Sequence, residues 1–509
     1  MTNLQQLHLR ARTDRHEANM RVLSYVLPFY IVAVLFTWLV FKDARYLHWF
    51  LVPIGLSGLI VLIDAVNWMT GRYDLFDPAG ILGLFMAHFF FSAPLMHITY
   101  DYWMRYVIPP SDWRDWLGWM AWLNFLGLVI YRVIRDFGFS TKSKPKMTMK
   151  WKINRKRLLL LLAAGLAVTG ALQMLVYAQS GGIVGYITAF EEGSAENFKG
   201  MGFVFMISES FPILFLMFWV IITQNKKWAK SWVMIIAILA VYFILKLLFG
   251  GLRGSRSNTI WGLFWAAGLI HLWVRPMTKQ FIAVAMVFLI SFMYIYGFYK
   301  AGGTEGIQAL MQGGSAKEEL QSSHNRGIET TLLADLGRSD VQAFLLYRLN
   351  IPDNGFKYAW GRTYIGSVTL LIPASLWPGR PETKLKEGTE LQYGSLEDSP
   401  GQKYSSRIYG LTGEAMLNFG IFAAPAAFII FAVYVRRLRV WMLTWDKDDS
   451  RMLILPFLIN LSLLMLGSDG DNIVFVLIKN GAVPFMILFL ASKKEMVFHN
   501  ALEQKEIAR

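Results

Sequence analysis

The sequence predicts an all-α polytopic membrane protein, and three observations support this class. Apolar side chains fall in runs of roughly 17 to 25 residues, the length at which a helix spans the hydrocarbon core of a bilayer. Hydrophobic residues make up 55% of the 509 positions and charged residues only 17%. The basic residues cluster in short connectors between the apolar runs, as the positive-inside rule requires of cytoplasmic loops.

The order of the segments gives a predicted domain organisation. Residues 1–21 are polar and lack the apolar core and cleavage site of a signal peptide, so we expect a cytoplasmic N-terminal segment. A transmembrane region with about nine spans follows over 22–299, then an extracytoplasmic loop domain over 300–413. A second region with about three spans covers 414–491, and 492–509 is a cytoplasmic tail. The twelve runs are 22–41, 48–68, 78–97, 115–134, 157–177, 202–223, 231–249, 257–274, 280–299, 415–435, 452–467 and 472–491.

The connector charges predict the orientation. The connectors over 132–157, 225–230, 275–279 and 436–439 and the tail from Lys493 are basic and are assigned to the cytoplasm together with both termini. The opposite side receives the acidic connector 178–200, the long loop and the short SDGD segment at 468–471.

Composition and missing motifs exclude several functions. The net charge of +15 comes without a basic patch interleaved with aromatic residues outside the membrane flanks, so nucleic-acid binding is excluded. The absence of cysteine excludes disulfides, thiolate metal sites and a cysteine nucleophile. No Walker-type loop, zinc-binding His-Glu helix or serine nucleophile elbow is present.

The interval 300–413 is the only long polar stretch of the chain. It contains apolar segments at 341–347 and 364–377, which a solvated tail would lack, so we expect a folded domain docked on the membrane. A loop of this length in a compact protein is usually functional or disordered.

Two arginines stand where the positive-inside bias discourages them. FGGLRGSRSN at 249–258 places Arg253 and Arg256 at the outer ends of two predicted spans. The glycines of the segment leave backbone amides open beside two guanidinium groups, a combination suited to phosphate oxygens. The segment is a candidate anion site; the alternative is that both side chains reach lipid headgroups at the interface.

Ionisable residues within spans are functional candidates because burying a charge in hydrocarbon is costly. Lys479 lies eight residues after Asp471, on the order of 12 Å into its span from the outer side. Glu209, in SES at 208–210, lies at a similar depth in another span. Both are candidates to line an outward-facing cavity, and the alternative for each is a structural ion pair or interhelical hydrogen bond.

The loop and its end offer further candidates. His324 is the only histidine of the loop and titrates in the range that general-base chemistry needs, although a loop histidine can simply be solvated. Arg326 follows it closely. Arg380 lies in the stiff turn WPGRPE, where it could position an anion or cap the turn. Glu414, where the chain re-enters the membrane, is a second acid/base candidate, or an acid favoured by a helix N-terminus.

Together these segments resemble a known family. The Gly/Arg cluster at 249–258, one large outer loop containing IPASLWPGRPE, and GLTGEAMLNFG at 410–420 opening the next span are similar to bacterial oligosaccharide repeat unit polymerases, the Wzy-type O-antigen and exopolysaccharide polymerases. The resemblance covers mainly 249–435. In some members an arginine is followed by ten residues and a glycine, a spacing that Arg326 and Gly337 match and that the other loop arginines lack.

The resemblance implies a fold and a function. The fold would be the lipid-phosphosugar glycosyltransferase (GT-C-like) architecture in the bacterial inner membrane. The substrates would be undecaprenyl-pyrophosphate-linked oligosaccharides, and the growing glycan would be transferred en bloc to a new lipid-linked repeat at the outer face. The resemblance also implies metal-independent catalysis without a cofactor, and membrane lipids, a chain-length regulator and a flippase as partners.

Under that reading the candidates take roles. The pyrophosphate would be bound by Arg253, Arg256, Arg326, Arg380 and Lys479, because positioned cations can stabilise a leaving pyrophosphate without a metal. The base would be His324, Glu414 or Glu209. An O-antigen ligase and a lipid-linked oligosaccharide flippase or transporter remain the alternatives, and the flippase is disfavoured because no inverted repeat is evident.

Overall fold

The computed structural model describes residues 3–104, 107–137, 147–191, 201–253, 256–315, 328–352, 354–373, 376–393 and 407–498. The chain forms two compact units, each built from separate stretches of sequence. Unit 1 contains Met1–Phe137, Leu332–Arg439 and Ser462–Asp471, and unit 2 contains Gly138–Thr331, Val440–Leu461 and Asn472–Arg509. The interval 300–413, predicted as one domain, therefore contributes to both units.

The prediction of a helical, multi-pass membrane protein is confirmed. Eight helices of the described part are long and apolar enough to cross a membrane, and each coincides with a predicted run. They are Val22–Lys42, Leu51–Thr70, Pro78–Thr99, Trp113–Asp136, Arg155–Gln179, Gly202–Thr223, Lys279–Lys300 and Gly470–Ala491. Two other predicted runs form shorter apolar helices, Trp232–Leu248 and Leu455–Gly467. The total of twelve spans stays a prediction.

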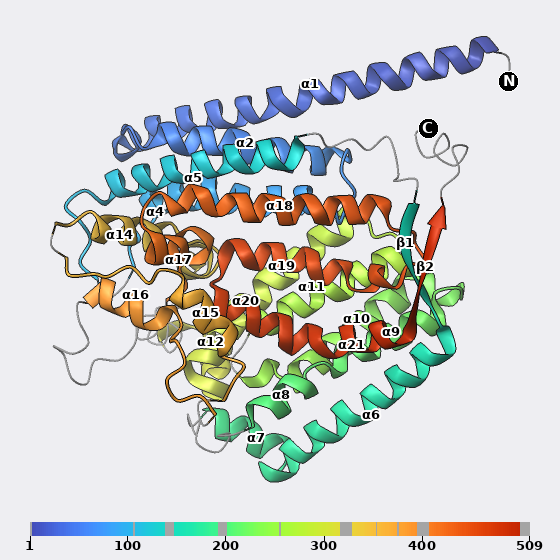
Figure 1. Cartoon of the computed structure of the whole chain (residues 1–509). Helices are drawn as coiled ribbons and strands as arrows, with labels where there is room; N and C mark the ends of the chain where they lie inside the picture. The colour runs from blue at the N-terminus through green and yellow to red at the C-terminus, as the bar shows by residue number, and fades with distance from the viewer. Residues whose placement is uncertain are drawn as a thin grey trace. The chain divides into compact units, whose positions relative to one another are not determined.

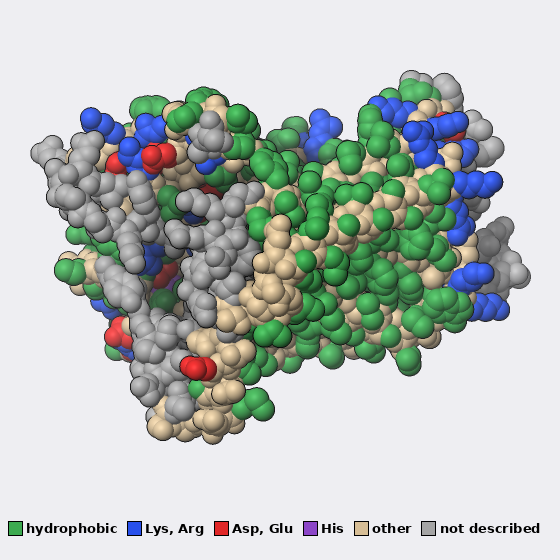
Figure 2. All heavy atoms as spheres, turned by 90° about the horizontal axis from the view of Figure 1, so that it is seen from below, with side chains coloured by type: hydrophobic (Ala, Val, Ile, Leu, Met, Phe, Trp, Pro, Cys, Tyr) green, Lys and Arg blue, Asp and Glu red, His purple; other side chains and the backbone are tan. Residues whose placement is uncertain are grey.

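Exposed apolar side chains are numerous, as expected of surfaces that face lipid. Figure 2 shows a broad field of hydrophobic side chains that ends at a group of lysines and arginines. Strongly exposed examples in unit 2 are Leu160, Val168, Val233, Val284 and Val287. An apolar field of this extent on a soluble monomer would mark an interaction site, whereas on spanning helices it is the expected lipid contact.

Unit 1 is organised around α2 and α5. Its described elements are α1 (Asn3–Lys42), η1 (Ala44–Tyr46), α2 (Leu51–Thr70), α3 (Pro78–Met86), η2 (Ala87–Ser92), α4 (Ala93–Thr99), α5 (Trp113–Asp136), α14 (Ser339–Leu349), α15 (Arg362–Thr369), α16 (Lys384–Tyr393), α17 (Gly410–Phe419) and most of α18 (Ala423–Thr444). Helix α2 packs against α1, α3 and α5, and α14 packs against α5, α16 and α17. Part of the predicted loop domain, the segment with α14–α16, is thus joined to membrane helices of the same unit (Figure 1).

Unit 2 is organised around α6 and α9. Its described elements are β1 (Met147–Ile153), α6 (Arg155–Gln179), α7 (Gly182–Glu191), α8 (Gly202–Ser208), α9 (Phe211–Thr223), η4 (Trp228–Lys230), α10 (Trp232–Leu248), η5 (Gly251–Arg253), α11 (Arg256–Trp273), α12 (Lys279–Gln312), η7 (Ser450–Leu453), η8 (Leu477–Gly481), α21 (Ala482–Ala491) and β2 (Ser492–Phe498). Helix α6 packs against α8, α9 and α21. The remaining elements, η6 (Thr330–Asp335), α19 (Leu455–Gly467) and α20 (Gly470–Val476), contain or adjoin boundaries between the units.

Polar caps set where several helices begin. The side chains of Asp112, Asn154 and Ser231 accept hydrogen bonds from backbone N–H groups in the first turns of α5, α6 and α10. Such caps satisfy N–H groups that have no partner within the helix. Each cap lies within three residues of a predicted run boundary, which explains why hydropathy located these spans closely.

The sheet β1–β2 is an exception to the all-α prediction. Met147 pairs with Phe498 and Ile153 with Ser492 in an antiparallel register, and the strands lie side by side in Figure 1. Lys150 also forms ion pairs with Asp446 at 3.4 Å and Asp448 at 2.6 Å. The structure thus brings three stretches of unit 2 together. Two of them lie in segments predicted to be cytoplasmic. The third closely follows the predicted cytoplasmic connector 436–439. The alternation of MTMKWKI was a signal for a strand that a hydropathy reading passes over.

Candidate functional site

Four of the eight predicted site residues lie wholly or partly outside the described structure. His324 and Arg326 fall in 316–327, outside the described residues. The backbone of Arg253 ends η5 and that of Arg256 begins α11, but their side chains are outside the described part of the chain. Their predicted roles stay predictions.

Arg380 contacts backbone oxygens in unit 1. Its Nη1 donates to the carbonyl oxygens of Thr369 and Leu370, at 3.4 and 3.1 Å, and also to that of Ile372. These carbonyls lie at and just beyond the end of α15, where helical oxygens lack intrahelical partners. The contact matches the capping alternative for Arg380 and engages its Nη1.

Glu209 and Lys479 form a buried ion pair in unit 2. Lys479 Nζ lies 2.6 Å from Glu209 Oε2, and the same oxygen accepts a hydrogen bond from Asn258 Nδ2 at 2.6 Å. Glu209 is fully buried and Lys479 is 6% exposed. The two candidates that the sequence offered separately are therefore partners, and Asn258 belongs to the Gly/Arg segment 249–258. We call Glu209, Lys479 and Asn258 the Glu209 cluster.

Breaks in two helices bring the Glu209 cluster together. Glu209 and Ser210 lie between α8 and α9, and Lys479 belongs to the π-helical turn η8. The Ser210 hydroxyl donates to the Lys479 carbonyl oxygen at 3.2 Å and joins these two breaks. Irregular backbone within membrane helices is tolerated where it is buried in protein or lines a cavity, and π-helical turns often occur at functional sites.

Gly250 allows the Gly/Arg segment to pass beside the carboxylate. Its φ is +127°, and a Cβ placed there would lie 2.4 Å from the Glu209 carboxyl carbon. Only glycine combines this backbone conformation with so close an approach. Gly250 and Asn258, near the two ends of the Gly/Arg segment, thus both lie against the Glu209 carboxylate.

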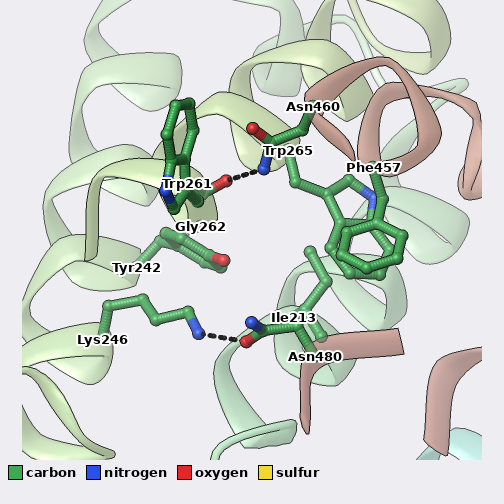
Figure 3. Close-up of a pocket in the computed structure, with 9 residues that line it drawn as sticks. All are labelled: Ile213, Tyr242, Lys246, Trp261, Gly262, Trp265, Phe457, Asn460 and Asn480. Carbon is green, nitrogen blue, oxygen red and sulfur yellow. Dashed lines mark hydrogen bonds between the residues drawn. The ribbon is translucent and has the colours of Figure 1, made fainter. Parts of the chain in front are cut away.

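A cavity with a mainly apolar lining and a few polar groups lies in the same unit, lined by α9, α10, α11, α19 and η8 (Figure 3). Its polar residues are Tyr242, Lys246, Asn460 and Asn480, and its empty volume is about 230 Å³. Lys246 Nζ donates to Asn480 Oδ1 at 3.1 Å, and Asn480 directly follows Lys479. The sequence analysis missed Lys246, although its position three residues before the end of an apolar run follows the rule that selected Lys479.

Glu414 occupies a separate polar site in unit 1, on α17. Its Oε1 accepts from the Thr363 hydroxyl at 2.8 Å and its Oε2 from the Gly470 N–H at 2.6 Å. Asn418, one turn further along α17, donates to Thr363 Oγ1 at 2.7 Å. Glu414 is only 2% exposed. The helix-terminus alternative for Glu414 receives no support from these contacts, because its partners come from α15 and α20 rather than from the first turn of α17.

A second buried ion pair lies next to Glu414. Asp469 Oδ1 accepts from the N–H groups of Tyr409 and Gly410, at 2.8 and 2.7 Å, and its Oδ2 is paired with Lys384 Nζ. Burial and the negative charge of Asp469 raise the pKa of Glu414 to about 8, against the opposing effect of the Gly470 N–H and the Thr363 hydroxyl. A carboxyl group with this pKa can exchange a proton near neutral pH, as acid/base catalysis requires.

The raised pKa predicts a pH dependence of stability. The ordinary pKa of a glutamate is 4.5, so between pH 4.5 and about 8 the folded state holds a proton that the unfolded state releases. The stabilisation by this bound proton is complete below pH 4.5 and is lost as the pH rises through about 8. Over this range the free energy of unfolding falls by roughly 3 to 5 kcal/mol in total. We expect Glu414→Gln to flatten the fall in melting temperature between pH 5 and 8. Melting curves of wild type and variant in detergent measure this, and parallel curves would contradict the prediction.

One group among the described residues has the composition of a metal site. His48, Asp112 and Asp115 in unit 1 place one potential ligand atom each within 4.8 Å of one another. His48 Nδ1 accepts from the Phe50 N–H at 3.3 Å, so a neutral His48 carries its proton on Nε2, the atom that faces the carboxylates. Asp112 is already paired with Arg114 at 2.7 Å. The group is better explained as a hydrogen-bonded loop contact.

Comparison of the chain with protein-family models, with curated proteins and with solved structures gives no match.

Proposed function

We propose that this protein is a polymerase of undecaprenyl-pyrophosphate-linked oligosaccharide repeat units. The observation that carries the proposal is the Glu209 cluster: a carboxylate and an ammonium group, predicted independently as site residues, lie against the Gly/Arg segment predicted to bind phosphate oxygens. The elements that supply Glu209, Lys479 and Asn258 are far apart in sequence. A site for glycosyl transfer from a pyrophosphate needs cations for the leaving group and a base for the acceptor, and this arrangement offers both.

The reaction would exchange one C–O bond for another. A hydroxyl oxygen of the acceptor sugar attacks the anomeric carbon of the donor glycan, and the bond from that carbon to the pyrophosphate oxygen breaks. The electron pair leaves with the lipid pyrophosphate, and the hydroxyl proton passes to a carboxylate. Negative charge therefore builds up on the leaving group, where fixed cations stabilise it most strongly.

The Glu209–Lys479 ion pair can open when a pyrophosphate binds Lys479 in place of Glu209. An arriving pyrophosphate would compete with Glu209 for the Lys479 ammonium group, and a carboxylate released from this ion pair is a stronger base. Arg253, Arg256 and Arg326 are the further predicted ligands of the pyrophosphate. His324 and Glu414 remain alternative bases, and the pKa of Glu414 near 8 supports its candidacy.

A lipid-linked oligosaccharide flippase or transporter is the second candidate function. The observation that favours it is the set of interrupted helices around a buried ion pair, since transporter sites are commonly formed by discontinuous helices. An O-antigen ligase would use the same donor chemistry with a different acceptor, and no contact described above distinguishes it from a polymerase.

The test is a reconstituted polymerisation assay. Purified protein in liposomes is supplied with undecaprenyl-pyrophosphate repeat units, and the products are separated as a ladder on a gel. We expect a ladder from wild type and at least a 100-fold lower rate from Glu209→Asp, which keeps the charge but withdraws the carboxylate by one methylene. The double variant Glu209→Lys with Lys479→Glu keeps an ion pair and is also expected to be inactive.

The controls distinguish the candidate functions. Lys230→Met, at an exposed position of unit 2, is expected to keep full activity. Transfer of labelled lipid across the liposome bilayer without a ladder would favour the flippase. A ladder from Glu209→Asp as strong as that from wild type would remove Glu209 from the reaction, and the same experiment on Glu414→Gln would then test the remaining described base.

A further inference from the structure

We propose that the cavity of Figure 3 is a binding site for one small inorganic anion of about chloride size, held by Lys246 and Tyr242. This site is distinct from the Glu209 cluster. The proposal does not depend on the polymerase function, because it rests only on the residues that line the cavity.

The cavity contains a buried lysine side chain. Lys246 is 1% exposed, and its contact in the described structure is the neutral Asn480 at 3.1 Å; no ion pair to Lys246 is found among the described residues. The neighbouring Lys479 is paired with Glu209. A charge taken out of water without a counter-charge is strongly unfavourable, and a bound anion would remove that cost.

Tyr242 directs a second donor to the same space. Its hydroxyl is fully buried and has no hydrogen-bond partner among the described residues. Tyr242 and Lys246 are one turn apart on α10, and Figure 3 shows both polar ends directed to the space lined by Asn480 and Phe457. Buried hydroxyl groups normally have a partner, so a ligand or ordered water is expected at this position.

The size and shape of the cavity limit the ligand. The cavity has room for about one water-sized particle, far less than pockets that enclose organic ligands offer. A Cβ at Gly262 would lie 2.6 Å from Lys246 Cε and 3.0 Å from the Tyr242 hydroxyl, so glycine at this position leaves room for both polar ends. The Lys246 amino group, when protonated, and the Tyr242 hydroxyl can both donate to one anion, and the positive charge of Lys246 disfavours a cation.

Thermal unfolding of the full-length protein in detergent tests the proposal. Chloride replaces gluconate at constant ionic strength, because gluconate is too large for the cavity. We expect the melting temperature of wild type to rise saturably with chloride by about 2 to 4 °C, since a ligand that binds only the folded state stabilises it. Lys246→Met is expected to abolish the rise, and Tyr242→Phe to increase the half-saturating chloride concentration about 3- to 10-fold.

The control is Lys230→Met, which removes an exposed lysine of the same unit and is expected to keep the chloride response of wild type. The proposal is overturned if wild type shows no saturable response specific to chloride, or if Lys246→Met responds as wild type does. If Lys246→Met does not fold, Tyr242→Phe decides: an unchanged half-saturating concentration excludes the site. Unfolding curves in bromide provide a second readout, with the same variants expected to lose the response.

Discussion

Replacing Lys479 with methionine is expected to lower the free energy of unfolding by about 3 to 5 kcal/mol. The Glu209 carboxylate is fully buried and would lose the ammonium group that lies 2.6 Å from its Oε2, while the neutral Asn258 would still donate to that oxygen. Glu209→Gln is expected to cost a similar amount because it leaves the Lys479 charge buried without its carboxylate. Unfolding in detergent, followed by circular dichroism, measures both losses.

A double-mutant cycle separates the charge pair from the packing of the two side chains. We expect the variant with both Glu209→Gln and Lys479→Met to be more stable than either single variant. The double variant has no charge at either position, whereas each single variant leaves one buried charge without its partner. The charge-reversed pair, Glu209→Lys with Lys479→Glu, is expected to recover part of the loss as well. Strictly additive losses in the double variant would show that the two residues stabilise the protein through separate contacts.

Asp469→Asn is expected to cause a comparable loss, about 3 to 5 kcal/mol, in unit 1. Asp469 is fully buried, and its carboxylate both accepts two backbone N–H groups at the start of α17 and neutralises Lys384, which is 3% exposed. Asparagine can still accept from the backbone, but it presents a neutral amide to the ammonium group. The same measurement of unfolding tests this, with Glu390→Gln on α16 as the control that removes an acid of the same unit with little effect.

The Asp469 variant has a second consequence that stability alone would not reveal. Part of the upward shift in the pKa of Glu414 comes from the negative charge of Asp469, so that pKa is expected to fall in Asp469→Asn. The pH-dependent loss of stability assigned to Glu414 should then move to lower pH. If the pH profile keeps its midpoint, burial alone sets the pKa of Glu414.

Much of the helical framework could be predicted because its signal is local. The eight membrane-length helices follow apolar runs, and capping residues such as Asp112 and Asn154 lie at their starts. The choice of Glu209 and Lys479 also came from a local rule, the cost of a charge within a span. Their pairing could not be predicted, because it depends on which of many helices meet in unit 2.

For other features of the structure, the local sequence carried no signal or a misleading one. The SDGD segment at 468–471 has the composition of a solvated turn, yet Asp469 is buried and joins α17 to Lys384. Lys384 lies in the polar interval 300–413, and nothing in its local sequence singles it out. In both cases the partner comes from a distant segment of unit 1, and composition carries no information about such contacts. Arg380 was predicted either to position an anion or to cap its turn, and its contact with carbonyl oxygens at the end of α15 likewise could not be read from composition.

The pairing of β1 with β2 has a consequence for how the protein is made. Strand β2 lies hundreds of residues after β1, so β1 emerges from the ribosome long before its partner exists. Until then, its backbone N–H and C=O groups form an open edge, which other extended chains can pair with. Completion of unit 2 therefore waits until β2 has been translated, and a nascent chain stalled before Ser492 would carry an unpaired strand. A chaperone or membrane surface that shields 147–153 during synthesis would protect the unfinished protein.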